Sequence, residues 1–166
     1  MSRILGRGCV ATLFVLSAAA ANADQTWDFR VFLDDKEIGT HRFDLLEQGG
    51  ERQLTSTATM KVKLLFVTAY TYDHHDVEHW QGDCLSKLTS TTDDNGRKHR
   101  VDVLRRDGAT VVQTLEGTQR LGECVLTFAY WNPAMLRQSW LLNSQDGEHV
   151  AVESKTPAPT PSTCVA

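Results

Sequence analysis

The sequence lacks any apolar run long enough to span a membrane. The longest, Cys9–Ala20, has about 12 residues, whereas a spanning helix needs about 20. Glycine-rich phosphate loops and a Gly-x-Ser-x-Gly nucleophile elbow are also missing. Basic residues are outnumbered, with 17 Lys and Arg against 21 Asp and Glu and a net charge of −4. These absences argue against nucleic-acid binding, against phosphate-loop enzymes and against a transmembrane segment in the mature chain.

The N-terminus has the pattern of a secretory signal peptide. Arg3 and Arg7 precede the short apolar run, and a small-x-small motif follows at Ala21-Asn22-Ala23. The pattern predicts export with cleavage near Ala23, so that residues 1–23 form the signal peptide. The loss of Arg3 and Arg7 then takes the net charge from −4 to −6.

Three cysteines remain after this cleavage, namely Cys84, Cys124 and Cys164. An exported protein meets an oxidising compartment, in which thiol pairs tend to become disulfides. Cys84 and Cys124 lie in patterned segments, so they form the preferred bridge. The alternative is that both are small buried side chains that never meet.

Between the signal peptide and the C-terminus, apolar and polar residues alternate with a period of two, which is typical of strands. Asn95-Gly96 and Asp107-Gly108 are strong hairpin signals, because such turns need positive φ. About eight short-spaced strands predict one mainly β domain over residues 24–153. Its fold class is a single antiparallel curved sheet, an open barrel or a sandwich. Val125–Trp131 is expected to be one of its strands.

Two C-terminal segments break the alternation. Pro133–Asn143 is predicted to be a short helix capped by Asn132, or else an extended crossover. Residues 154–166, ending in SKTPAPTPSTCVA, are rich in Pro, Ser and Thr and are expected to form an unstructured tail.

Met60–Leu85 carries most of the groups with chemical potential. If Met60–Trp80 is one long strand or a bent pair of strands, its even-numbered residues share a face that grades from apolar to aromatic and polar. Such a face is typical of a pocket wall, or of a sheet face that emerges into water. Trp131, from an aromatic turn for which core packing is the simpler role, is added to the predicted ligand-binding set. That set is Phe66, Tyr70, Tyr72, His74, Glu78, Trp80 and Trp131.

The histidines His74, His75 and His79 raise the question of a metal site. On a strand, His75 and His79 share a face but lie about 13 Å apart, too far to bind one ion. Ligands from a neighbouring strand, such as His41 or His99, would be needed. No metal and no cofactor are therefore predicted.

The chain resembles the DUF6134 family of exported bacterial proteins, which is related to the DUF3108 group of envelope proteins. The segments TWDFRVFLDDKEIGTHRF, VKLLFVTAYTYDHHDVEHWQGDCL, TSTTDDNG, YWNP and LLNSQDGE carry the resemblance over most of residues 26–148. The resemblance implies a periplasmic β-rich domain and assigns no catalytic residue. Members of the family continue with further strands where this chain has its Pro/Ser/Thr tail. A frameshift or a premature stop would account for that departure.

Together these features predict a non-enzymatic periplasmic protein that binds a lipophilic or envelope-derived small molecule. One alternative is a metal-dependent hydrolase centred on His74, His75 and His79. Another is a structural module that binds an envelope protein.

Overall fold

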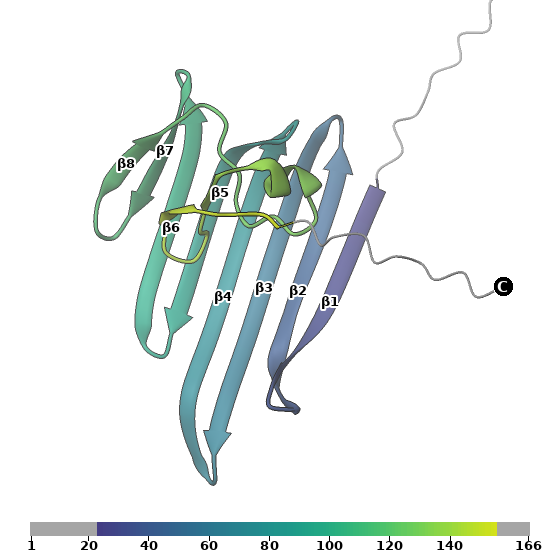
Figure 1. The fold of residues 1–166 in the computed structure, drawn as a ribbon, viewed down its shortest axis with the longest axis vertical. Coiled ribbons are helices and arrows are strands. Elements are labelled where there is room, and N and C mark those ends of the chain that lie inside the picture. Colours follow the sequence, from purple (N-terminus) through teal and green to yellow (C-terminus); the bar gives the residue numbers. More distant parts are fainter. Residues whose placement is uncertain (1–22, 156–166) are drawn as a thin grey trace, which may run out of the picture.

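The protein is an open antiparallel sheet, one face of which is crossed by its C-terminal segment (Figure 1). The computed structural model describes residues 23–155, so the predicted signal peptide (apart from Ala23) and most of the predicted tail lie outside the described residues. The strands run in chain order across the sheet, each paired with the next. They are β1 Ala23–Leu33, β2 Lys36–Gln48, β3 Glu51–Leu64, β4 Val67–Gln81, β5 Cys84–Asp94, β6 Arg97–Arg106, β7 Ala109–Thr114 and β8 Thr118–Leu121.

The predicted mainly β, antiparallel fold is confirmed, and the sheet is not closed into a barrel. Within residues 23–155, β1 and β8 are the edges and do not pair with each other. The two predicted hairpin turns are present, with φ of 52° and 90° at Asn95 and Gly96 and of 52° and 69° at Asp107 and Gly108. No helix in the described part of the chain is long and apolar enough to cross a membrane.

The C-terminal segment, residues 122–152, crosses the sheet as mostly irregular chain. It contains the 3₁₀ turn η1 Pro133–Arg137 and a small antiparallel pair, β9 Trp140–Leu142 and β10 His149–Ala151. Asn132 caps η1 as predicted, because its side-chain oxygen accepts a hydrogen bond from the Ala134 backbone N–H at 3.0 Å. We call residues 122–152 the covering segment.

For this segment one prediction was wrong, and the short helix is present over part of its predicted range only. Val125–Trp131 is not a strand, since its sole ladder contact is an isolated bridge between Thr127 and Leu142. The helix predicted over Pro133–Asn143 stops at Arg137, and the chain then extends. The extended path buries Leu141 and Leu142 against the sheet and satisfies Leu142 N–H with the Leu126 carbonyl at 2.8 Å.

The main core lies between the covering segment and the sheet. Alternate residues of the central strands point into it, and Trp80 is completely buried. The sheet contributes Trp80, Leu85, Leu88, Val101, Val103 and Val112, and the covering segment contributes Val125, Leu126, Ala129, Ala134, Leu141 and Leu142. Covering one sheet face in this way buries apolar surface without a second sheet, which is why the sheet need not close.

The predicted Cys84–Cys124 disulfide is present, with a Cα–Cα distance of 5.0 Å. It joins the start of β5 to the start of the covering segment. Beside it, the Leu85 backbone N–H donates to the Val125 carbonyl at 3.0 Å. The bridge therefore fixes the point at which the covering segment comes down on the sheet.

Gly39 allows β2 and β3 to approach closely at the end of their ladder. It pairs with Met60, and the β1–β2 register shifts next to it, between Val31 and Phe32. A methyl group at Gly39 would overlap the Thr59 carbonyl oxygen. We expect Gly39→Ala to lower the free energy of unfolding by about 1–3 kcal/mol, measured by urea denaturation. Gly122→Ala, where a methyl group meets nothing within 4 Å, is the matched control and should not destabilise; equal effects would contradict this account.

Candidate functional site

A cleft of about 500 Å³ lies between the inner face of the sheet and the covering segment. Strands β2, β3 and β4 form its floor, and residues 128–130 and 143–145 form its far side. Its lining combines apolar and aromatic side chains with several polar ones. The lining residues are His41, Phe43, Leu54, Ser56, Ala58, Met60, Tyr70, Tyr72, His74, Asp76, Glu78, Phe128, Tyr130, Asn143, Ser144 and Gln145.

Strand alternation explains why β4 supplies so many of these groups. Tyr72, His74, Asp76, Glu78 and Trp80 are all buried on the inner face, whereas the odd-numbered residues face outward. Four of the residues predicted for the ligand site, Tyr70, Tyr72, His74 and Glu78, do line the cleft.

The other three predicted residues lie elsewhere. Trp80 is buried in the core beside the cleft, and Trp131 packs edge-on against it with ring centroids 5.3 Å apart. The Arg52 guanidinium covers Trp131 at 4.7 Å from the ring centroid. Phe66 is fully exposed at the turn between β3 and β4. The structure thus brings the cleft residues together but leaves Phe66 outside the cleft.

A chain of buried hydrogen bonds starts at the covering segment and ends in the cleft. The Thr92 hydroxyl donates to the Gln145 carbonyl at 3.1 Å, so at 2.8 Å from His74 Nδ1 it can only accept. His74 Nδ1 therefore carries a hydrogen. His74 Nε2 lies 3.1 Å from Asp76 Oδ2, where two lone pairs would repel, so one proton must lie between them.

The chain of hydrogen bonds ends at Asp76, whose second carboxylate oxygen has no hydrogen-bond partner among the described residues. The Asp76 side chain is only 4 % exposed, and this oxygen is its Oδ1. Burying an unpaired charged acceptor is costly. Because Asp76 lines the cleft, a molecule bound there can supply the missing donor.

Glu78 lies next to Asp76 on the same face and is fully buried. Burial, followed by the negative charge of Asp76, raises the pKa of Glu78 to about 8. The Trp80 indole N–H donates to Glu78 Oε2 at 2.9 Å, which opposes the rise without cancelling it. Glu78 is therefore protonated at neutral pH.

His41 and Ser56 form a second polar contact at the cleft. His41 Nε2 lies 2.9 Å from the Ser56 hydroxyl, across strands β2 and β3. Burial, then the positive charge of His74, lowers the pKa of His41, so its ring is neutral near pH 7 and can accept the hydroxyl proton. Among the described residues, no carboxylate hydrogen-bonds the other ring nitrogen of His41. The pair thus has two of the three parts of an activated serine nucleophile.

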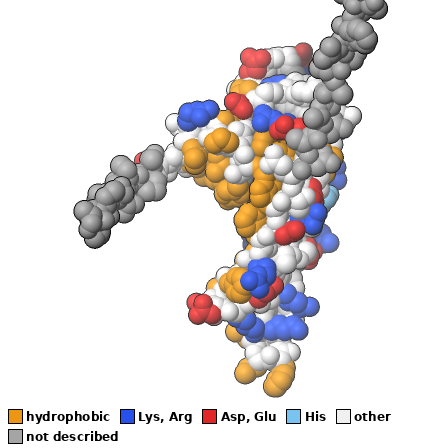
Figure 2. Space-filling view, turned by 90° about the vertical axis from the view of Figure 1, so that its right-hand side faces the viewer, with side chains coloured by type: hydrophobic (Ala, Val, Ile, Leu, Met, Phe, Trp, Pro, Cys, Tyr) orange, Lys and Arg blue, Asp and Glu red, His pale blue; other side chains and the backbone are white. Residues whose placement is uncertain are grey.

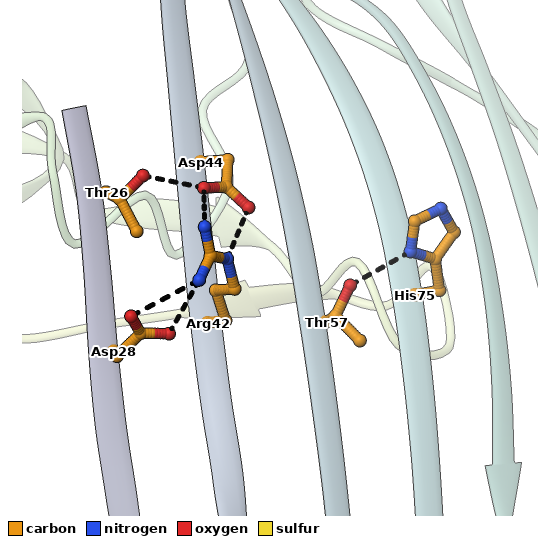
Figure 3. A network of polar contacts seen from close by, with 6 residues as sticks. All are labelled: Thr26, Asp28, Arg42, Asp44, Thr57 and His75. Atoms are coloured by element: carbon orange, nitrogen blue, oxygen red, sulfur yellow. Dashed lines mark hydrogen bonds and ion pairs between the residues drawn. The ribbon is translucent and has the colours of Figure 1, made fainter. Parts of the chain in front are cut away.

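The three histidines of the predicted metal alternative are not brought together. His74 is buried on the inner face, while His75 faces outward and its Nδ1 lies 3.2 Å from the Thr57 hydroxyl. Figure 3 shows His75 on this outer face, which also carries Arg42 between Asp28 and Asp44. In residues 23–155, no group of three His, Cys, Asp or Glu side chains could hold a metal ion.

A larger depression of about 650 Å³ borders the cleft at Gln145. It is lined by charged and polar residues of β5–β8 and the covering segment, some of them exposed, such as Arg97 and Glu148. It holds no buried polar atom without a partner. The smaller cleft is therefore the better candidate for a binding site.

The predicted ligand-binding set left out three cleft residues that carry ionisable or nucleophilic groups, namely His41, Ser56 and Asp76. His41 and Ser56 meet only through the register of β2 and β3, which pairs His41 with Ala58. Asp76 does share the even-numbered face of β4, and its place between His74 and Glu78 was the available signal.

Comparison with known proteins gives a family and no activity. The family model described as "Domain of unknown function (DUF6134)" matches residues 29–163. No curated protein and no solved structure shows a match.

Proposed function

Since the chain belongs to the DUF6134 family, whose function is undefined, we propose its function from the cleft: it is an exported protein that binds a small amphipathic molecule. The molecule has an apolar body and a hydrogen-bond-donating end, such as a hydroxyl or an amine. Export to the periplasm, with cleavage near Ala23, is part of the proposal. It is supported by the N-terminal sequence pattern and by a disulfide, which forms in oxidising compartments.

The observation that carries the proposal is the unpartnered Asp76 Oδ1 in a cleft with apolar walls. The volume of about 500 Å³ falls in the range of small-molecule sites. Phe43, Leu54 and Phe128 offer apolar contacts, and Asp76 offers a charged acceptor that orients one end. The lining is divided evenly between apolar or aromatic side chains and polar ones, which suits a molecule that has both kinds of surface.

A fluorescent probe tests this proposal. N-phenyl-1-naphthylamine is apolar and has one N–H donor, and we expect it to bind with enhanced emission. Asp76→Asn is expected to weaken its binding by about tenfold or more, because a hydrogen bond to a charged group is lost. Asp73→Asn, on the outer face of the same strand, is the matched control and should bind as the wild type does.

Two further measurements keep this test decisive. Ala58→Leu fills the cleft without changing a titratable group, and it should also reduce probe binding. Mass spectrometry of solvent extracts should detect a co-purifying molecule in the wild type and less of it in both cleft variants. If Asp76→Asn and Ala58→Leu unfold cooperatively and still bind the probe normally, the cleft is not the binding site.

A further inference from the structure

The hairpin of β3 and β4 projects beyond the rest of the sheet (Figure 1). Pairing of β2 with β3 ends at Gly39–Met60, and pairing of β4 with β5 ends at Tyr72–Asp94. Apart from a hydrogen bond from the Asn95 backbone N–H to the Thr71 carbonyl at 2.8 Å, the backbone of β3 and β4 beyond these points pairs only within the hairpin, as far as Leu64–Val67. We call residues 61–70 the projecting hairpin. Leu65 lies five residue steps along the strand from Met60, which corresponds to about 16 Å.

The end of this hairpin is apolar and exposed. Leu65 is 93 % exposed, Phe66 is fully exposed, and both Leu64 and Val67 are about two-thirds exposed, at 65 % and 68 %. We call residues 64–67 the apolar tip. Large side chains gathered on a protruding end are unusual in a protein surface unless they contact something.

The turn at the apolar tip also goes against local backbone preference. Leu65 has φ of 58°, a left-handed conformation that bulky residues rarely adopt. The other turns that join β1 through β7 use aspartate, asparagine or glycine, at 34–35, 49–50, 82–83, 95–96 and 107–108. The turn conformation does not explain a leucine and a phenylalanine at these positions. We therefore attribute them to what their side chains contact.

Positive charge lies directly behind the apolar tip. Lys61 and Lys63 are both exposed, and residues 61–70 contain no acidic residue in a chain of net charge −4. Figure 2 shows hydrophobic side chains at the lower end of the molecule, with lysine and arginine side chains above them. Along a strand, Lys63 and Lys61 lie about 7 and 13 Å behind Leu65.

We propose that the projecting hairpin docks the protein on an anionic lipid bilayer, with the apolar tip inserted and the two lysines at the level of the head groups. Interfacial segments insert about 5–10 Å, which matches the distance from Leu65 to Lys63. Four side chains on a convex end bury much less than the roughly 800 Å² per partner of a stable protein interface. A bilayer requires no complementary shape, so it suits such a tip better than a protein does.

Docking in this way would also position the cleft. Met60 and Tyr70, at the base of the projecting hairpin, line the cleft as well. The cleft would therefore lie about 16 Å from the inserted tip, close enough for an amphipathic molecule to pass between membrane and protein. This last consequence rests on the proposed function, whereas the docking itself does not.

Vesicle flotation with the purified protein tests the proposal. We expect binding to vesicles of phosphatidylethanolamine with about one-third phosphatidylglycerol, and little binding to pure phosphatidylcholine. Lys61→Gln with Lys63→Gln should weaken binding to the anionic vesicles by about fivefold per lysine. High salt should have the same effect, because it screens the lysines.

The variant Leu65→Asn with Phe66→Gly removes the apolar tip while giving the hairpin its preferred Asn-Gly turn. It should keep or raise the unfolding midpoint and lower vesicle binding by tenfold or more. Leu115→Asn, which removes an exposed leucine outside the hairpin, is the control and should bind normally. Normal vesicle binding by the Asn-Gly variant, or no binding by the wild type, would overturn the proposal. So would a wild-type self-association that the Asn-Gly variant abolishes, since the tip would then contact a second copy.

Discussion

Reducing the Cys84–Cys124 disulfide is expected to lower the free energy of unfolding by about 4 kcal/mol. The bridge joins residues separated by 40 positions, and closing a loop of this length restricts the unfolded chain by about that amount. Domains of this size are stable by only about 5–15 kcal/mol. Loss of the bridge therefore removes a large fraction of the total stability.

The location of the bridge adds a structural reason for the effect. It anchors the start of the covering segment, which supplies half of the main core, including Leu126 and Leu142. β9 and β10 pair with each other and, at Leu142, with Thr127 of the same segment, but with none of the strands β1–β8, so the covering segment has little sheet pairing to hold it. We expect hydrogen exchange to increase first in residues 122–152 when the bridge is reduced.

The measurement is urea denaturation of a Cys164→Ser variant with and without reductant, so that only the Cys84–Cys124 pair can form. The double variant Cys84→Ser with Cys124→Ser should match the reduced form. If the oxidised and reduced proteins unfold at the same urea concentration, the bridge contributes nothing and this account fails.

The fold could be predicted from the sequence where local chemistry determines it. Period-two alternation defines the strands, and Asn95-Gly96 and Asp107-Gly108 form hairpins because they tolerate positive φ. The same rules failed at Leu65-Phe66, which adopts a turn without any turn-forming residue. For this reason Phe66 was assigned to the pocket wall, whereas it lies at the end of the projecting hairpin.

The covering segment could not be predicted, because its path depends on what it covers. Leu136 and Trp140 have helical spacing, yet both are more than half exposed, and the buried residues are the adjacent Leu141 and Leu142. An extended chain can bury two consecutive leucines when it contacts both the sheet and the rest of the covering segment. Neither the helical period nor the strand period of the sequence indicates such burial. The contact between His41 and Ser56 in the cleft was not predicted for a related reason. The register of β2 and β3 brings these residues together, and this register cannot be read from their separation in the sequence.

Replacing Glu78 with glutamine is expected to make the protein more stable at pH 8 and nearly unchanged in stability at pH 5. The pKa of Glu78 is raised to about 8 in the folded protein, by burial and then by Asp76, from 4.5 for an unperturbed group. Between these values the folded state holds a proton that the unfolded state has released. The wild type therefore loses stability as the pH rises from about 4.5 to about 8, by up to about 1.4 kcal/mol per pH unit.

Glutamine removes this dependence while keeping an oxygen that can accept the Trp80 indole N–H. The comparison must be a difference between variant and wild type, because His41 acts in the opposite direction. The pKa of His41 is lower in the folded protein than its ordinary value of 6.5. The protein therefore gains stability as the pH rises from the pKa of the folded state to 6.5, the value expected in the unfolded state. Subtracting the two denaturation curves at each pH cancels this contribution and leaves that of Glu78.

Glu51→Gln, at an exposed position on β3, is the control and should leave the pH dependence as it is in the wild type. The expected difference between Glu78→Gln and wild type grows with pH to several kcal/mol at pH 8, measured by urea denaturation. A difference that stays constant from pH 5 to pH 8 would mean that Glu78 is ionised throughout.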